Sequence, residues 1–396
     1  MGTKIKIGEI CDILNGFAFK SEKYVAKGIR VIRIANVQKG YLEDSAPQYY
    51  PNETADELKR YMLEENDLLM SLTGNVGRVA LLPADMLPAA LNQRVACLRV
   101  KDPEKMDKQF LFQFLNSDYF ESQCILSAKG IAQKNMSTEW LKEYEIPLFT
   151  KDKQKRISKE LTEIDGVIAV RKKQLSKLDE LVKSRFIELF GDPMDNPMGW
   201  DRVNISAVVG GKVSNGFFAK RDDYCDDGNV KVLGVAHVVN RMYSNTEGLP
   251  KTNGTEADIA KYGVKYGDML FCRSSLVAAG IGKASIVPKN VPSNVLFECH
   301  VIRLPLDLTK CVPEFMQVLS TTEYFRSQII AQSKTATMTT IGQDGILKTD
   351  IILPPLEKQK QFLQFVEQTD KSKLAIQQSL AELESLKKAL MQKYFG

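Results

Sequence analysis

The stretch KQKRISKELTEIDGVIAVRKKQLSKLDELVKSRFIELFG, residues 153–191, decides how this chain folds. Its apolar side chains recur at alternating intervals of four and three residues, which is the heptad spacing of a helix that packs against another helix. The stretch has no proline and a single glycine, Gly166. At about 1.5 Å per residue, a helix over 153–190 would be about 57 Å long. We therefore predict a long helix whose apolar stripe needs a partner.

The same pattern returns at the end of the chain. KQKRI at 153–157 is matched by KQKQF at 358–362, and SRFIELFG at 184–191 is matched by ALMQKYFG at 389–396, both at an offset of 205 residues. Mutual packing of the two helices is the simplest way to cover both stripes. A helix that lies on the core of its own domain would show the same spacing, so this alternative stays open.

The expected seam between the helices is interrupted by charged residues. Arg171 and Arg185 occupy heptad positions in the first helix, and Lys373 and Lys387 do so in the second, where Leu374 and Leu386 lie beside the lysines and are alternatives to them. The other seam positions are Ile157, Leu161, Ile164, Ile168, Leu175, Leu178, Val182 and Leu189 in the first helix, and Phe362, Val366, Thr369, Ile376, Leu380, Leu383, Leu390 and Tyr394 in the second.

The repeat extends over the rest of the chain. NGFAFK at 15–20 returns as NGFFAK at 215–220, an offset of 200, and LNSDYFESQ at 115–123 returns as STTEYFRSQ at 320–328, an offset of 205. Self-similarity at a fixed period is the signature of a repeated structural unit. The sequence therefore predicts two tandem copies of one unit, each ending in a long helix.

The first part of each copy is expected to mix strands and helices. Short runs rich in Val, Ile and Leu, bounded by Gly, Pro or Asn, are typical of strands. A helical period indicates one helix in each copy. The expected helices cover 108–123 and 313–328, and the expected strands cover 29–37, 67–72, 78–83 and 94–100 in the first copy and 230–239, 268–274, 283–288 and 299–304 in the second.

Composition excludes several classes of protein. Hydrophobic residues make up 44% of the 396 residues and charged residues 26%, which is typical of a globular chain. No apolar run approaches the roughly 20 residues that span a bilayer, so we expect no contact with membranes. The seven cysteines have no C-x-x-C spacing, which favours reduced thiols in a cytoplasm.

Catalytic motifs are missing from the sequence. The chain has two histidines, His237 and His300, and no P-loop, G-x-S-x-G or H-E-x-x-H pattern. We therefore predict a protein that is not itself an enzyme and that binds no cofactor or metal.

The modest net charge of +5 is concentrated in one segment. Residues 151–185 contain 11 Lys or Arg and 6 Asp or Glu. A charged helix face is usually solvated, and the alternative is that it borders phosphate groups. So small a net charge argues against tight non-specific DNA binding by the chain alone.

Three loops at matched positions in each copy have the polar and small residues that reach base edges in DNA. They cover 15–23, 71–78 and 127–137 in the first copy and 213–221, 272–283 and 332–340 in the second. The candidate DNA-binding residues are Lys20, Thr73, Asn75, Arg78, Lys129, Gln133, Lys134 and Asn135 in the first copy, and Lys220, Arg273, Ser274, Lys283, Lys334, Thr335 and Thr337 in the second.

These features together resemble the specificity subunits of type I restriction–modification systems. The matching stretches, in order, are GEICDILNGFAFK, DLLMSLTGNVGRVALLP, LNQRV at 91–95, AKGIAQKNMS, IPLFTKDKQKRI and the helix that closes in LFGDP at 189–193. The resemblance implies an α+β chain with two tandem α/β target recognition domains, separated by two long helices that form an antiparallel coiled coil with pseudo-twofold symmetry. The implied segments are recognition domains at 1–150 and 196–355 and helical regions at 151–195 and 356–396.

The resemblance also implies partners and a division of labour. The chain would bind a split, asymmetric target in double-stranded DNA and position two methyltransferase (modification) subunits and the restriction or translocase subunits. S-adenosylmethionine, ATP and Mg²⁺ are expected on those partners. A coiled-coil adaptor that does not read DNA and a stand-alone DNA methyltransferase or nuclease are the alternatives.

The repeated NGF phrase would then open both recognition domains. Gly16 and Gly216 are expected to permit a tight turn. The aromatic side chains Phe17, Phe19, Phe217 and Phe218 are expected to pack in the protein rather than stack on bases, because phenylalanine is usually buried.

Overall fold

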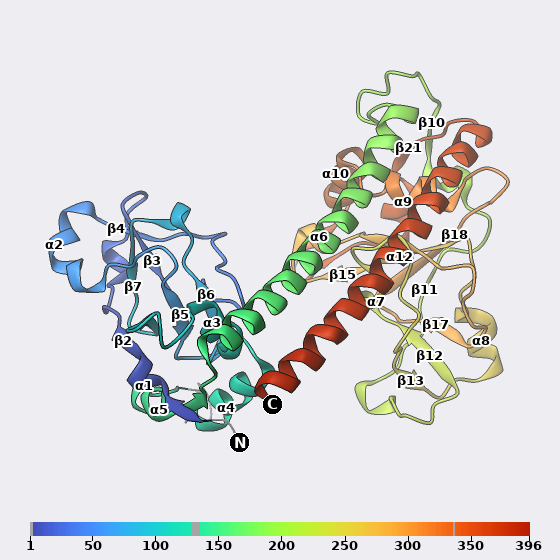
Figure 1. The fold of residues 1–396 in the computed structure, drawn as a ribbon. Coiled ribbons are helices and arrows are strands. Elements are labelled where there is room, and N and C mark those ends of the chain that lie inside the picture. The colour runs from blue at the N-terminus through green and yellow to red at the C-terminus, as the bar shows by residue number, and fades with distance from the viewer. Residues whose placement is uncertain (1–2, 129–134, 336) are drawn as a thin grey trace. The chain divides into compact units, whose positions relative to one another are not determined.

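In the computed structural model, which describes residues 3–128, 135–335 and 337–396, the chain forms two compact units (Figure 1). Unit 1 comprises Met1–Lys172 and Gln378–Gly396, and unit 2 comprises Lys173–Gln377. The long helices α6 (Lys151–Phe190) and α12 (Leu356–Phe395) each contribute one half to each unit. The prediction of two long helices and of a mixed helix-and-sheet fold is confirmed.

Unit 1 is built on small sheets whose central strands are largely buried. One sheet is antiparallel with four strands, a second has three strands in which β3 and β7 run parallel, and a two-stranded ladder lies beside them. In spatial order the sheets are β2 (Cys11–Asn15), β8 (Val95–Val100), β5 (Leu68–Ser71) and β6 (Val79–Leu81); β4 (Tyr49–Tyr50), β3 (Ile29–Ile32) and β7 (Ala89–Leu91); and β1 (Lys4–Lys6) with β9 (Glu145–Pro147).

Unit 2 repeats this topology strand for strand, as the internal repeat predicts. It has one more small sheet, β15–β20–β19, at the place where the described residues of unit 1 form a single bridge between Thr73 and Asn135. The sheets are β11 (Ser214–Asn215), β18 (Val301–Pro305), β14 (Asp268–Cys272) and β16 (Ala284–Ile286); β13 (Lys251–Thr252), β12 (Val230–Leu233) and β17 (Val295–Phe297); β10 (Arg202–Asn204) with β21 (Asp350–Ile352); and β15 (Ser274–Ser275), β20 (Thr339–Thr340) and β19 (Lys334–Thr335).

The prediction of a single helix over 108–123 and over 313–328 is wrong, because each of these segments forms two helices. Ser117 caps the second helix, since its hydroxyl accepts a hydrogen bond from the Phe120 N–H, and the Thr322 hydroxyl caps the second helix of unit 2 by accepting from the Phe325 N–H. The strand predicted over 230–239 also ends early, and a short helix follows Gly234. The helices are α3 (Lys108–Leu115), α4 (Asp118–Ser127), α9 (Pro313–Leu319), α10 (Glu323–Ala331) and α7 (Val235–Val238).

Five shorter helices complete the α-helices of the described part of the chain. Thr255 caps one of them in a capping box with Asp258. They are α1 (Ile7–Ile10), α2 (Ala55–Leu58), α5 (Thr138–Glu143), α8 (Glu256–Tyr262) and α11 (Gln343–Leu347).

The two long helices pack together in both units, which confirms the predicted pairing. In unit 1, Ile157 and Leu161 near the start of α6 share a core with Phe395 at the end of α12. In unit 2 the pattern is reversed, because Phe190 at the end of α6 packs against Phe362 near the start of α12, with 5.7 Å between ring centroids. The start of one helix therefore meets the end of the other, and the pairing is antiparallel. Figure 1 shows the two helices side by side.

Lysines occupy the seam at the two places where leucine was the alternative. The Lys387 ammonium lies 2.5 Å from Asp165 in unit 1, and the Lys373 ammonium lies 2.7 Å from Asp179 in unit 2. Leu374 and Leu386 are exposed, so the expectation that they replace the lysines is wrong. Both ion pairs join residues two heptads apart along each helix, and they specify the same antiparallel register.

Glu314, on α9, is a fully buried carboxyl group beside α12. Its Oε1 atom accepts hydrogen bonds from the hydroxyls of Tyr243 and Tyr266, both at 3.1 Å. Burial raises the pKa of Glu314 above its ordinary value. A carboxyl group whose pKa is raised by folding contributes stability below its unfolded pKa, and that stability is lost as pH rises through the folded pKa.

We expect Glu314→Gln to stabilise unit 2 at pH 7.5 and to have little effect near pH 4. Glutamine keeps an oxygen acceptor for both tyrosines and carries no charge to desolvate. A gain of about 1 kcal/mol would raise the Tm by roughly 2–4 °C in a domain of this size. Thermal unfolding of both proteins from pH 4 to pH 8 checks this. A variant that loses stability as pH rises would contradict it.

Candidate nucleic-acid interface

The two NGF loops are held by the same backbone contact. The Phe17 N–H donates to the Leu91 carbonyl at 2.8 Å, and the Phe217 N–H donates to the Phe297 carbonyl at 2.7 Å. A Cβ atom on Gly16 would lie closer than 3.0 Å to backbone atoms of Asn92, and one on Gly216 would lie equally close to Phe297. The glycines therefore permit a close approach of two chain segments, and the predicted tight turn is wrong.

Three of the four loop phenylalanines pack in the protein as expected. The Phe17 ring lies 5.1 Å from Phe19 and 5.3 Å from Tyr61, and the Phe217 ring lies 5.8 Å from Tyr262. Phe218 differs, because its side chain is 68% exposed. The expectation that it packs in the interior is wrong, since its neighbour Phe217 takes the inward position.

In unit 1 the predicted loops converge through backbone pairing. The Leu72 N–H donates to the Arg94 carbonyl at 3.0 Å, and the Met136 N–H donates to the Leu72 carbonyl at 2.9 Å. Thr73 and Asn135 form an antiparallel bridge. The NGF loop joins this group through 91–93. We call these segments the first loop cluster: residues 15–20, 71–78, 92–94 and 135–136.

In unit 2 the corresponding loops converge in the same way. The Arg273 N–H donates to the His300 carbonyl at 2.8 Å, which is the counterpart of the Leu72–Arg94 bond. Strand β20 pairs with both β15 and β19, and the Gln343 amide donates to Asn215 at 3.2 Å. We call these segments the second loop cluster: residues 215–220, 272–275, 298–300, 334–335 and 337–343.

The structure places the candidate residues of unit 1 as follows. Lys20, Asn75 and Asn135 are exposed, and Thr73 is half-buried. Arg78 is half-buried, and its guanidinium donates a hydrogen bond to the Gln38 side chain at 2.5 Å. Its guanidinium is therefore engaged within the protein. The last three candidates, Lys129, Gln133 and Lys134, lie outside the described residues.

Most candidates of unit 2 lie in the second loop cluster. Lys220, Lys334, Thr335 and Thr337 are exposed. Arg273 is half-buried and donates to the Cys299 carbonyl at 3.2 Å.

The remaining two candidates of unit 2 are held by neighbouring side chains. The Ser274 hydroxyl lies 3.2 Å from the His300 ring. Lys283 lies apart from the other candidates, because its ammonium donates to Asn240 at 2.7 Å.

Sequence reasoning missed Arg94 and His300. Both are exposed. Each directly precedes an inner strand of the four-stranded sheet, β8 in unit 1 and β18 in unit 2. The stretch LNQRV at 91–95 aligns with FECHV at 297–301 at an offset of 206, close to the offsets used elsewhere. This alignment was the signal that could have identified the two residues.

The side chains of these clusters are suited to binding. Burial raises the pKa of the Cys272 and Cys299 thiols, so both thiols stay protonated at neutral pH and are poor nucleophiles. Among the described residues no group of His, Cys, Asp and Glu is arranged to hold a metal ion. Exposed Arg, Lys, Asn and Gln side chains on a rigid backbone frame are suited to hydrogen bonding with base edges and phosphates.

Comparison with known proteins identifies the class. Residues 3–180 and 197–385 each match the type I restriction modification DNA specificity domain, so the chain belongs to this family. It is similar to the specificity subunit of the type I restriction enzyme MjaVIII of Methanocaldococcus jannaschii, with 28% identity over 45% of this chain and 43% of that protein. It is also similar to the EcoAI specificity subunit of Escherichia coli, with 31% identity over 45% of this chain and 28% of that protein.

The matches to these two relatives thus span less than half of the relatives' length. The match to another relative extends over almost the whole of this chain. The EcoBI specificity subunit of Escherichia coli is 20% identical over 99% of this chain and 85% of that protein. The fold is also similar to the crystal structure of a type I restriction–modification S subunit from M. genitalium, with a TM-score of 0.55, 15% identity and coverage of 100% and 96%.

None of the helices in 3–128, 135–335 and 337–396 is both long enough and apolar enough to cross a membrane.

Proposed function

We propose that this chain is the DNA-recognition subunit of a type I restriction–modification complex, and that each loop cluster reads one half of a split target. The observation that carries the proposal is the pair of loop clusters built on one backbone frame. Phe17 and Phe217 make the same anchoring bond, and the bond of Leu72 to Arg94 has its counterpart in that of Arg273 to His300.

The side chains on this shared frame differ between the units. Leu72 of unit 1 is replaced by Arg273 in unit 2, and Arg94 is replaced by His300. Arginine pairs with guanine in the major groove, whereas histidine makes other contacts and the buried Leu72 reaches no base, so two such readers select different bases. An asymmetric, bipartite target follows from one frame that carries two sets of side chains.

Membership of this family supports the proposal that the chain works with partner subunits. A subunit that recognises double-stranded DNA would act on it through its partners, which are two methyltransferase subunits and the restriction or translocase subunits. These partners would hold S-adenosylmethionine, ATP and Mg²⁺, and the complex would work in the cytoplasm.

We expect substitutions in one loop cluster to weaken recognition of one half-site only. Asn75→Ala with Arg94→Ala should affect the first half, and Arg273→Ala with His300→Ala should affect the second. A lost base contact costs about 1–3 kcal/mol, or roughly 5–150-fold in preference for the correct base. Methylome sequencing of cells that carry each variant reads both half-sites in one experiment.

The outcomes separate the proposal from its alternatives. If either double variant relaxes both half-sites equally, the two-reader proposal is wrong. An adaptor that does not read DNA would give no sequence-selective gel shift even with the methyltransferase subunits present. Methyl transfer or cleavage by the purified chain alone would support a stand-alone enzyme instead.

A further inference from the structure

A cationic cavity of about 420 Å³ lies within unit 2, beside the second half of α6. It is bounded by the junction between α9 and α10 and by the start of β16. The charged side chains that line it are Asp179, Lys183, Arg241, Lys283, Arg326 and Lys373.

Most of these cations have no acidic partner. Lys373 is held by Asp179, but within the described residues no carboxylate lies within 4.0 Å of Lys183, Arg241, Lys283 or Arg326. Lys283 donates to the neutral side chain of Asn240, and Arg241 donates to backbone carbonyls.

Arg326 is the least satisfied of the four. One of its terminal nitrogens donates to the Ala279 carbonyl at 3.2 Å, and the other is buried without a hydrogen-bond partner in the described part of the chain. Burial lowers the pKa of its guanidinium, and the nearby charge of Glu323 offsets only part of that effect. A buried donor left unpaired costs free energy that a bound acceptor would recover.

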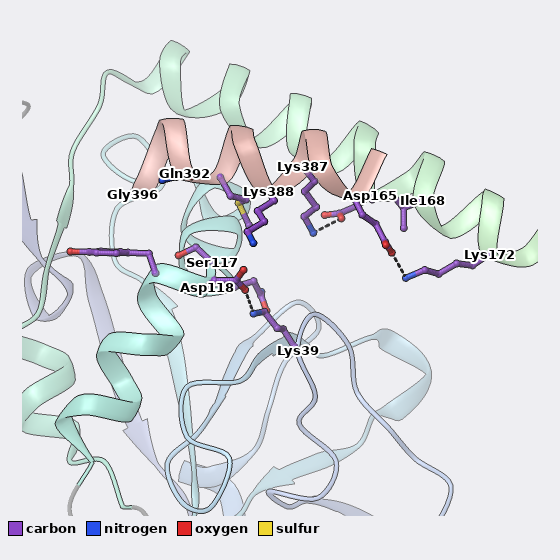
Figure 2. A pocket seen from close by; sticks show the side chains of 14 residues that line it. Lys39, Ser117, Asp118, Asp165, Ile168, Lys172, Lys387, Lys388, Gln392 and Gly396 are labelled. Carbon is purple, nitrogen blue, oxygen red and sulfur yellow. Dashed lines mark hydrogen bonds and ion pairs between the residues drawn. The ribbon is translucent and has the colours of Figure 1, made fainter. Parts of the chain in front are cut away.

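The equivalent place in unit 1 has the opposite character (Figure 2). A cavity of about 660 Å³ lies there between the junction of α3 and α4 and the helix pair. Lys39 contacts both Asp118 and Glu121 at 2.6 Å, and Lys387 contacts Asp165 at 2.5 Å.

Lys172 is neutralised in the same way, because it lies 3.1 Å from Glu384, so three of the four lysines that line this cavity are paired. The fourth, Lys388, has no carboxylate within 4.0 Å in the described part of the chain. Since the same fold surrounds both cavities, the unpaired charge of unit 2 is a property of its residues and not a requirement of the fold.

The cationic cavity adjoins the second loop cluster. The Lys283 carbonyl accepts a hydrogen bond from the Cys272 N–H at 2.9 Å, so the cavity-lining Lys283 and the loop residue Arg273 lie on adjacent paired segments. The Ala279 carbonyl that binds Arg326 belongs to the same loop. A DNA duplex whose bases contact this loop would bring its backbone to the cavity.

We propose that the cavity lined by Lys183, Arg241, Lys283 and Arg326 binds a phosphate group of the DNA backbone, and that unit 1 has no counterpart. The proposal rests on the function proposed above. Arginine guanidinium and lysine ammonium groups are the donors that bind phosphate. The carboxylate that lines the cavity, Asp179, is paired with Lys373 and not with these four cations. A free phosphate has the same chemistry and must be distinguished by experiment.

The test compares Lys183→Gln/Arg241→Gln with a matched control in unit 1, Lys172→Gln/Lys388→Gln. Affinity of the full chain, assembled with its methyltransferase subunits, is measured by fluorescence anisotropy on a target duplex between 50 and 200 mM salt. Loss of one phosphate contact should reduce the slope of log affinity against log salt by about 0.9. We expect a roughly 3- to 30-fold loss of affinity for the unit 2 variant and an unchanged slope for the control.

The preference for the correct over a mutated half-site should not change, because a phosphate contact carries no sequence information. An unchanged slope, or a changed preference, would overturn the proposal. Arg326→Gln is measured in parallel with its Tm, so that a loss of folding is not mistaken for a loss of binding. The slope on random DNA stays informative even if the half-site variants above refute the proposed function.

The source of the phosphate is tested without DNA. Inorganic phosphate is titrated against chloride at equal ionic strength, and the Tm is followed. A saturable rise that Lys183→Gln/Arg241→Gln removes, together with an unchanged DNA salt slope, would assign the cavity to free phosphate and overturn the assignment to the DNA backbone. A reduced DNA salt slope in the variant supports the proposal.

Discussion

Replacing Gly16 by alanine is expected to abolish recognition of one half-site while the other stays intact. The added Cβ would lie closer than 3.0 Å to backbone atoms of Asn92, and neither segment can yield alone because Phe17 is paired with Asn92 and bonded to Leu91. Overpacking against a backbone typically costs about 1–3 kcal/mol, and here it separates the NGF loop from Arg94. Gly216→Ala should abolish recognition of the second half-site and leave the first intact.

The measurement is the methylation level at targets mutated in each half separately. We expect more than about 100-fold loss at the affected half, because a displaced loop loses several base contacts of about 1–3 kcal/mol each. Gly166→Ala is the matched control, since a Cβ there meets nothing within 4 Å and alanine favours the helix. Equal damage to both half-sites by Gly16→Ala would show that the units do not read independently.

The features that could be predicted from the sequence are those that depend on periodicity. Heptad spacing predicted α6 and α12 because an apolar stripe over 40 residues has few other uses. The offset near 205 predicted that both units share a topology, since each copy has to bury the same pattern. The prediction of two helices that pack on each other needed no knowledge of the loops.

Features that depend on single polar side chains were harder to predict. The helical period over 108–123 continues across Ser117, and only the capping bond from Phe120 shows that one helix ends and another begins there. Likewise, the choice of Lys373 and Lys387 over Leu374 and Leu386 depends on carboxylates supplied by the other helix. Such partners are distant in sequence, so no local pattern reveals them.

The candidate interface was predicted in outline. Loop composition indicated the segments that converge, and the bond from Arg273 to His300 shows how backbone pairing assembles them. Loop composition could not indicate that Arg94 and His300 lie between those loops, because each residue directly precedes a strand outside the loops that were considered. The contrast between the two cavities also depends on which lysines find acids in three dimensions. The four-segment division at 150, 195 and 355 and the pseudo-twofold relation of the copies stay predictions.

Inserting one heptad into each long helix is expected to change the spacing between the two half-sites and not their sequences. One insertion follows Leu175 in α6 and the other follows Ile376 in α12, positions that the Lys387–Asp165 and Lys373–Asp179 pairs place opposite each other. Seven residues lengthen a helix by about 10 Å, or roughly three base pairs at about 3.4 Å each. A whole heptad keeps the seam and both ion pairs in register.

We expect methylome sequencing of this double variant to show the same two half-sites with an unspecified spacer longer by about two to four base pairs. Methylation of the original target should fall by more than about 100-fold, because binding one half-site leaves the other reader out of position. A single insertion in α6 alone is the control, and it should disable the protein because it shifts one seam by a heptad and leaves Asp165 or Asp179 without its lysine. Full activity of the double variant at the original spacer would mean that α6 and α12 do not set the separation of the half-sites, and the rigid connection would then have to lie elsewhere in the complex.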